Sequence, residues 1–398
     1  MLRLRLLLLL AALTAFGPMS LDLYLPAFPS IAESFGTDTG SVLLTMSACL
    51  IGLGVGQVFW GPVSDRYGRK RPLVVGLAVF IGASLLIAVA PSFAALVVLR
   101  LLQALGGSAG IVIARAVVRD LYSGNDLARA MSAIVTVFAI APVVAPLIGS
   151  GILLVAPWPW MFVFLAAFAT ACLIGVLRMP ETLPADRRTD HNARGAVGQY
   201  RTIIANPQFR FAAVIAALGS TALFTYISSS PAVIIDFYGV GEGGFALIFA
   251  GLSLCFALGA QINMRLLKRF RVIALLRASV ATQLAASIAV LAGALLVVAL
   301  PVLLIPLVVA LMTVAGVNSN GIALALDPFP RSAASAAALV GGLQMTMGAL
   351  ASAVFSGLSV SPPVEMGLGM ATAGAVSVTL IALSLRGGRR RDSATMPT

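Results

Sequence analysis

GPVSDRYGRKRP, residues 61–72, is the stretch of this sequence that says most about the fold. It is short and charged, and it separates two apolar runs at 42–60 and 73–90. Each run has roughly the 20 residues that an α-helix needs to cross about 30 Å of hydrocarbon. We therefore interpret the stretch as a tight loop that joins two membrane-spanning helices on one side of a bilayer.

The rest of the chain repeats this alternation of apolar runs and short polar breaks. Of its 398 residues, 60% are hydrophobic and 10% are charged, with a mean hydropathy of +1.03. We predict an all-α polytopic membrane protein with twelve spans. The expected spans are 6–29, 42–60, 73–90, 93–118, 127–155, a sixth that follows the Pro/Trp turn at 157–160 and ends near 177, then 209–235, 245–264, 272–296, 301–325, 333–359 and 367–385.

The spans divide into two halves of six. We expect a first half at 1–179, a polar cytoplasmic linker without apolar periodicity at 180–207, a second half at 208–386 and a disordered cytoplasmic tail at 387–398. A faint internal repeat supports this division, because Pro26 in the first span and Pro231 in the seventh lie at equivalent places. Two parallel six-span halves around a central site are a known plan for transporters.

Positive charge is placed on one side of this arrangement. With the N-terminus inside, the inner segments hold 25 of the 26 Lys and Arg residues, and the outer loops hold only acids, among them Glu33, Asp38, Asp236, Glu242 and Glu365. This positive-inside pattern predicts that both termini are cytoplasmic. It also accounts for the net charge of +12 without a nucleic-acid partner.

Two charges lie inside the predicted spans of the first half. Asp22 is about 24 Å from the inner edge of its span, and Arg100 is about 12 Å below the outer edge of the fourth span. Both therefore fall in the outer half of the membrane, where an opposite-charge pair costs far less than two isolated charges. We hypothesise that Asp22 is a proton switch opposed by Arg100. The alternatives are an idle Asp22 at the wet boundary and an Arg100 that braces helix carbonyls.

The charged turn at 61–72 suggests specific roles for three residues. We expect Gly61 to permit close helix contact, Asp65 to pair with a cytoplasmic Arg, and Gly68 to adopt a positive φ. A generic positive-inside loop would explain the basic residues but not this spacing. In the fifth span, Pro142 and Pro146 lie among small residues, which predicts a kink and tight packing against a neighbour, or a kink of structural importance alone.

The chain resembles the major facilitator superfamily, and within it the Bcr/CflA group of drug:proton antiporters. The resemblance covers nearly the whole sequence and rests on several segments, with Ala141, Ala145 and Ser150 standing where the fifth-span pattern prefers Gly. These segments are 61–73, LRLLQALG at 99–106, APVVAPLIGS at 141–150, DLYLP at 22–26, FTYISSSP at 224–231 and ALALDPFP at 323–330.

The resemblance implies a role for each matching residue. Asp22 would titrate and compete with the drug, and Arg100 would tune it. The cytoplasmic side would be latched by Gly61, Asp65, Arg66, Gly68 and Arg69, and the fifth span would be sealed against the other half by Pro142, Pro146 and Gly149. A drug pocket should be mostly apolar with few polar groups. Its candidate lining, where ordinary packing is the alternative, is Asp22, Tyr24, Gln57, Gln103, Phe138, Tyr226, Asn318 and Met345, of which Tyr226 and Asn318 are the strongest.

These features predict a proton-coupled multidrug exporter in a bacterial cytoplasmic membrane. We expect a lipid-embedded monomer that uses the proton gradient, without cofactor or metal, to export small amphipathic antibiotics such as amphenicols or bicyclomycin. Cys49, Cys172 and Cys255 are expected to be buried small hydrophobes, and His191 a solvated loop residue. The alternative is a transporter of an endogenous sugar or nucleobase. A membrane enzyme is disfavoured because the spans contain no His and no paired acids.

Overall fold

The computed structural model describes residues 2–122, 124–184, 188, 193–329, 332–355 and 360–394. The regular secondary structure of these residues is helical. The elements are α1 (Leu2–Thr14), α2 (Phe16–Asp22), η1 (Leu25–Ala27), α3 (Phe28–Phe35), α4 (Thr39–Tyr67), α5 (Lys70–Ala88), α6 (Phe93–Leu121), α7 (Gly124–Leu153), α8 (Pro159–Arg178), α9 (Ala193–Ala205), α10 (Pro207–Pro231), η3 (Ala232–Phe237), α11 (Glu242–Leu266), α12 (Val272–Leu295), α13 (Leu300–Leu326), α14 (Ala333–Phe355) and α15 (Pro362–Ala394).

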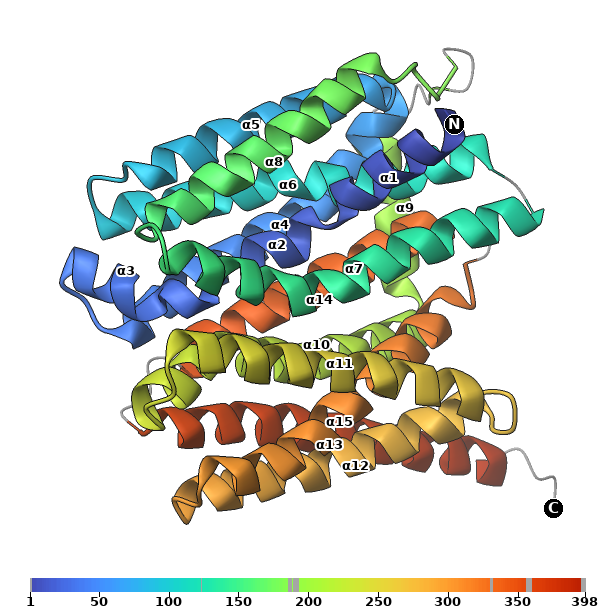
Figure 1. Cartoon of the computed structure of the whole chain (residues 1–398). Coiled ribbons are helices and arrows are strands. Elements are labelled where there is room, and N and C mark those ends of the chain that lie inside the picture. The colour runs from blue at the N-terminus through green and yellow to red at the C-terminus, as the bar shows by residue number, and fades with distance from the viewer. Residues whose placement is uncertain are drawn as a thin grey trace.

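The long helices run side by side in two bundles (Figure 1). In the first bundle α6 packs on α4 and α5, and α5 packs on α8. In the second, α13 packs on α10, α11 and α12, while α15 packs on α10 and α12. The bundles meet where α4 contacts α14 and where α7 contacts α11. The N- and C-terminal ends lie at the same end of the molecule (Figure 1).

The predicted membrane-spanning fold is confirmed. Among the described residues, eleven helical segments are long and apolar enough to cross a membrane. The twelfth predicted span corresponds to α7, whose apolar part among those residues is Ile140–Leu153. The first span is longer than expected, because it continues past residue 29 to Phe35.

Proline interrupts the first and seventh spans at matching places. The helix α2 ends at Asp22, and Pro26 lies in the 3₁₀ turn η1 before α3 begins. In the second half, α10 ends at Pro231 and continues as the π-helical segment η3. Proline lacks an N–H and clashes with the preceding turn, so it disfavours a regular helix. The internal repeat thus places a change in helix geometry at corresponding positions of the two halves.

The linker and the tail differ from the prediction. We expected no periodic structure in the linker, but α9 forms there with Ile203 buried and Ile204 exposed. The hydroxyl of Tyr200 on α9 donates to the Val58 carbonyl at 3.4 Å. The helix α15 continues to Ala394, into the segment expected to be disordered. His191 lies outside the described residues.

Candidate functional site

Asp22 is buried at the boundary between the two bundles. It is the last residue of α2 and its exposed fraction is 2%. Its Oδ1 atom has no hydrogen-bond partner among the described residues. Tyr226 on α10, also 2% exposed, is close enough to interact electrostatically with Asp22, and its Oη atom likewise lacks a partner there. Two orphaned polar atoms from opposite halves therefore share one buried region, which requires a functional explanation.

An aromatic wall supports the Tyr226 side of this region. The rings of Tyr226 and Phe249 stack with their centroids 5.6 Å apart and their planes at 16°. Phe249 belongs to α11 and also contacts the ring of Phe245, with a centroid distance of 5.7 Å. The region thus combines a carboxylate and a phenol hydroxyl with flat apolar surface, as expected of a site for an amphipathic small molecule.

Arg100 does not form the ion pair with Asp22 that we expected. Its side chain is fully buried, and it donates from Nη2 to the Ser20 carbonyl at 2.7 Å and from Nη1 to Gln103 Oε1 at 2.5 Å. Its guanidinium carbon lies 4.1 Å from the centroid of the Tyr24 ring, a cation–π contact. Arg100 therefore braces the backbone two residues before Asp22 through these contacts, while its Nε atom has no hydrogen-bond partner among the described residues.

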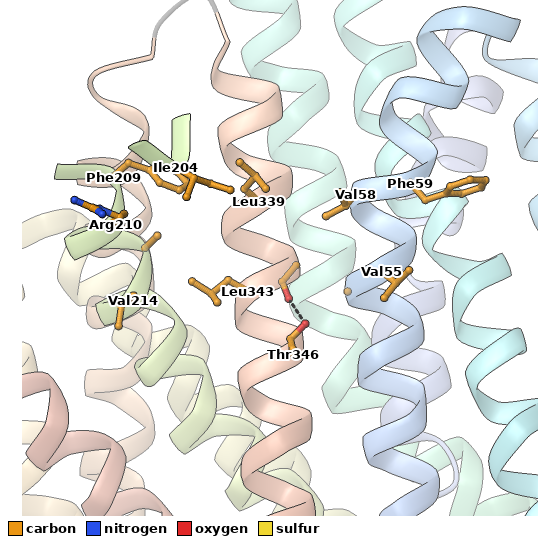
Figure 2. A pocket seen from close by; sticks show the side chains of 13 residues that line it. Val55, Val58, Phe59, Ile204, Phe209, Arg210, Val214, Leu339, Leu343 and Thr346 are labelled. Atoms are coloured by element: carbon orange, nitrogen blue, oxygen red, sulfur yellow. Dashed lines mark hydrogen bonds between the residues drawn. The ribbon is translucent and has the colours of Figure 1, made fainter. Parts of the chain in front are cut away.

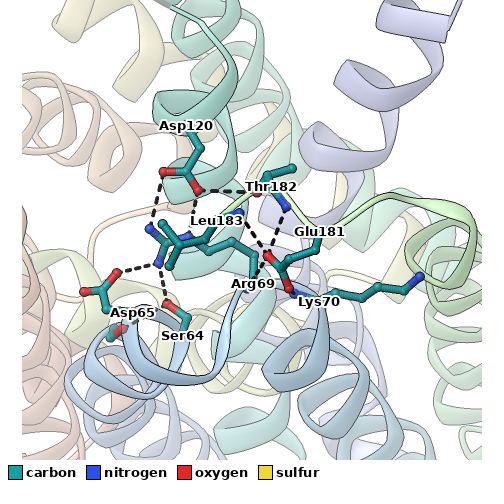
Figure 3. A network of polar contacts seen from close by, with 9 residues as sticks. Ser64, Asp65, Arg69, Lys70, Asp120, Glu181, Thr182 and Leu183 are labelled. Carbon is teal, nitrogen blue, oxygen red and sulfur yellow. Dashed lines mark hydrogen bonds and ion pairs between the residues drawn. The ribbon is translucent and has the colours of Figure 1, made fainter. Parts of the chain in front are cut away.

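A polar network at the other end of the first half is centred on Arg69 (Figure 3). Its guanidinium donates to Asp65 Oδ1 at 2.5 Å, to Ser64 Oγ at 3.0 Å and to Asp120 Oδ2 at 2.8 Å. Only 6% of the Arg69 side chain is exposed, compared with 17% for Asp120 and 49% for Asp65. Burial disfavours the charged Arg69, but hydrogen bonds to Asp120 and Asp65 outweigh it and raise its pKa.

Glu181 closes the network from the segment after α8. Its carboxylate accepts backbone N–H groups from Arg69 at 2.8 Å, Lys70 at 3.1 Å, Thr182 at 3.0 Å and Leu183 at 3.1 Å. Partial burial would raise the pKa of Glu181, but these four donors outweigh it and lower that pKa. The carboxylate therefore caps the start of α5, where helical N–H groups have no partner within the helix.

The network confirms part of the prediction for the turn and corrects the rest. Gly68 has a φ of +86°, and a Cβ there would lie 2.5 Å from Glu181 Oε2. Arg66 is exposed and lies over the Tyr67 ring, 5.3 Å from its centroid, outside the network. The expected close contact at Gly61 is wrong, because a Cβ there would meet no atom within 4 Å. Sequence reasoning missed Asp120 and Glu181 as partners. Their signal was an acid at the end of an apolar run or just beyond it, facing a basic turn.

In α7, the tight packing is directed at the first span. A Cβ added to Gly149 would collide with the carbonyl oxygen of Leu23, within the break after α2. The expectation that Gly149 seals against the other half is therefore wrong. The neighbouring Ser150 makes that contact instead, donating to the Glu242 carbonyl of α11 at 3.1 Å. Pro146 is buried and Pro142 is half-buried within the same helix.

The side chains of three candidate pocket residues form hydrogen bonds within their own halves. The hydroxyls of Tyr24 and Thr45 are 3.0 Å apart, and Gln103 donates to Ser84 Oγ at 2.7 Å while accepting from Arg100. Asn318 accepts from Ser220 Oγ at 3.2 Å. These bonds explain why the three side chains are polar without a ligand.

The remaining candidates lie where α4 meets α14 or outside the described side chains. A Cβ at Gly341 would meet Gln57 Oε1, and a Cβ at Gly54 would lie 3.1 Å from the Cβ of Met345. Gln57 and Met345 therefore contact the opposite half. The side chain of Phe138 is outside the part of the chain that the structure describes.

An apolar groove of about 730 Å³ runs between α4, α10 and α14 (Figure 2). It contains none of the expected pocket residues, and Arg210 is its one charged side chain. The lining residues are Gly54, Val55, Val58, Phe59, Ile204, Phe209, Arg210, Ala213, Val214, Leu339, Gly342, Leu343 and Thr346.

Comparisons with known proteins agree with this architecture. The family profile described as Major Facilitator Superfamily matches residues 8–356. An uncharacterized MFS-type transporter, YdgK of Bacillus subtilis, is 33% identical over 369 residues, covering 92% of this chain and 91% of the relative. The bicyclomycin resistance protein homolog of Haemophilus influenzae is 26% identical and covers 93% of each chain. The crystal structure of a D-xylose-proton symporter superposes with a TM-score of 0.72 at 14% identity, covering 94% of this chain and 97% of that one.

Proposed function

The chain belongs to the Major Facilitator Superfamily and is a multi-pass membrane transporter, and from this premise we propose that it exports small amphipathic drugs in exchange for protons. Its similarity to a bicyclomycin resistance protein homolog favours the Bcr/CflA type. We propose a monomer in a bacterial cytoplasmic membrane, with both termini in the cytoplasm. The proton gradient drives it, and it needs no cofactor.

The observation that carries this proposal is the buried carboxylate of Asp22, whose Oδ1 atom has no described hydrogen-bond partner, near Tyr226 of the other half. A buried carboxylate without a cation is stable only when a proton or a positively polarised ligand neutralises it. Because Asp22 lies where the two halves meet, its occupant changes as the halves move. A site that holds either a proton or a drug, but not both, couples their movements in opposite directions.

Arg100 and the Arg69 network would hold the first half rigid around this site. Arg100 fixes the backbone at Ser20, while Arg69 joins the ends of α4 and α6. Both clusters lie within one half, so they can remain intact while α4 moves against α14. The latch role expected of Asp65 and Arg69 is thus proposed as a brace of the moving unit.

The apolar surroundings favour drugs over sugars or nucleobases as cargo. Recognition of a sugar requires several free amide or hydroxyl groups, because every substrate hydroxyl must find a partner. Here Gln103 and Asn318 are already bonded within the protein. The groove at the α4–α14 contact is lined almost entirely by apolar side chains.

The test measures transport of chloramphenicol and bicyclomycin in proteoliposomes with an imposed pH gradient. Wild type should move each drug against the drug's concentration gradient, and a protonophore should abolish this movement. Asp22→Asn should lower the driven rate at least about tenfold, because its side chain cannot carry a proton. Glu33→Gln is the matched control, since Glu33 is an exposed acid on α3 of the same span. Full driven export by Asp22→Asn would refute the proposal.

A further inference from the structure

A second carboxylate is buried in the half where the sequence indicated no deep charge. Glu365, which we expected in an outer loop, lies in the first turn of α15 and is only 8% exposed. The hydroxyl of Ser229 on α10 donates to its Oε1 atom at 3.4 Å. Neither of the two ion pairs among the described residues involves Glu365. A buried acid with one long hydrogen bond is costly unless it binds protons for a purpose.

The face of α10 that packs against α15 carries hydroxyl groups that could pass a proton on from Glu365. Ser228 and Ser230 donate back to carbonyls of their own helix, at 3.1 and 2.9 Å, so only Ser229 of these three serines reaches Glu365. One turn deeper, Thr225 is 1% exposed and its Oγ1 has no partner among the described residues. It faces Gly369, which is one turn along α15 from Glu365, since a Cβ there would lie 3.2 Å from Thr225 Oγ1.

This row of hydroxyls leads toward the central site. Tyr226 is adjacent to Thr225 and about 4.5 Å along the helix axis from Ser229. Its orphaned hydroxyl interacts electrostatically with Asp22. Two hydroxyls without described partners, those of Thr225 and Tyr226, therefore lie within about one turn of α10 from Ser229, and that of Tyr226 is near Asp22.

The charged groups on the elements packed against α15 do not neutralise Glu365. The described members of α10, α12, α14 and η3 contribute Arg210, Tyr226, Asp236 and Arg277. Arg210 is exposed near the start of α10, whereas Ser229 lies near its end. Arg277 is exposed near the start of α12, and Asp236 is exposed on η3. Only the uncharged phenol of Tyr226 lies within one turn of Ser229.

We propose that Glu365 is a second proton-binding carboxylate, which receives protons from the outer solution and passes them along α10 to Asp22; this inference rests on the proposed proton-coupled export. Protonated Glu365 donates its proton to the Ser229 hydroxyl and becomes a carboxylate. Each hydroxyl in turn accepts one proton on oxygen and releases its own, with water bridging the wider steps, until Asp22 is protonated. The net change is the transfer of one proton from Glu365 to Asp22.

The first test does not depend on transport. In lipid nanodiscs, infrared difference spectra between alkaline and acidic pH should contain a carboxylic acid C=O band that Glu365→Gln removes and Glu365→Asp shifts. Glu242→Gln is the control, since Glu242 lies in the first turn of α11 at the same end of the molecule and is partly exposed. Its loss should leave the band unchanged. An unaltered band in Glu365→Gln would overturn the proposal.

The second test separates delivery of protons from binding of drug. Chloramphenicol movement driven by an outer acid pH should fall at least about fivefold in Glu365→Gln, whereas drug exchange without a gradient should persist, since Asp22 is intact. Thr225→Val should slow driven movement in the same direction. Driven movement at the wild-type rate in Glu365→Gln would overturn the relay. If wild type moves no drug, the proposed function fails, and the infrared band still decides whether Glu365 binds protons.

Discussion

Asp120 should matter more to the stability of this protein than Asp65, although Asp65 is the acid in the recognisable charged turn. Both carboxylates accept hydrogen bonds from the buried guanidinium of Arg69. Asp120 is 17% exposed and comes from a different helix, whereas Asp65 is 49% exposed and lies four residues before Arg69. Water therefore competes far more effectively with the hydrogen bond between Asp65 and Arg69 than with the one between Asp120 and Arg69.

The magnitudes follow from these exposures. Replacing one partner of a fully buried pair costs about 3–5 kcal/mol, and Arg69 in Asp120→Asn retains Asp65, so we expect about 1–3 kcal/mol. Asp65→Asn removes a half-exposed i,i+4 pair and should cost about 0–1 kcal/mol. For a chain of this size, the first change should lower the unfolding midpoint by roughly 2–6 °C and the second by less than about 2 °C.

The native cysteines supply the assay. Cys49 and Cys172 are buried and Cys255 is partly buried, so a thiol-reactive fluorophore reports unfolding as heat exposes them. The two variants should be compared with wild type in the same detergent at neutral pH. A midpoint for Asp65→Asn equal to or below that of Asp120→Asn would refute the argument from burial.

Three further predictions concern other parts of the site. Gly149→Ala should destabilise by about 1–3 kcal/mol in the same thermal assay, because its Cβ collides with the Leu23 carbonyl, whereas Gly151→Ala, with open space around it, should be neutral or stabilising. Glu181→Gln should lower the unfolding midpoint at neutral pH, and the difference from wild type should vanish in acid. The reason is that the fold lowers the pKa of Glu181. Its contribution to stability is therefore complete above the unfolded pKa of about 4.3 and is lost as the pH falls through the lower pKa of the folded protein. A constant difference down to strongly acidic pH would contradict this. Tyr226→Phe should leave the midpoint unchanged, because its hydroxyl has no described partner, yet raise the half-saturating chloramphenicol concentration roughly threefold or more; an unchanged concentration counts against a role in binding.

The fold could be predicted from the sequence because its signals are long and redundant. Twenty-residue apolar runs identify the spans, and the two matching prolines, Pro26 and Pro231, mark corresponding breaks. The positive φ of Gly68 also followed from its place in a tight turn. The amphipathic helix α9 did not, since polar residues obscure its short apolar face.

The site was less predictable, because the rotation of each helix about its own axis decides which side chains contact one another. Depth along the membrane correctly placed Asp22 and Arg100 among buried residues, but depth does not say which way each side chain points. Arg100 instead contacts a carbonyl, an amide and an aromatic ring, none of which carries a charge signal in sequence. Glu365 was misplaced because an acid near the end of a span fits a loop as readily as a buried helical turn.

The interruption after Asp22 gives the first span a joint between α2 and α3. Residues 23–24 follow α2 without belonging to the next helix, and beyond η1 the segment α3 is held by Trp158 Nε1, which donates to Ser34 Oγ at 2.9 Å. The joint separates α3 from the part of the span that Arg100 braces at the Ser20 carbonyl. The carboxyl group of Asp22 lies at this joint, so gaining or losing a single hydrogen ion changes the charge at the point where the first span is least regular.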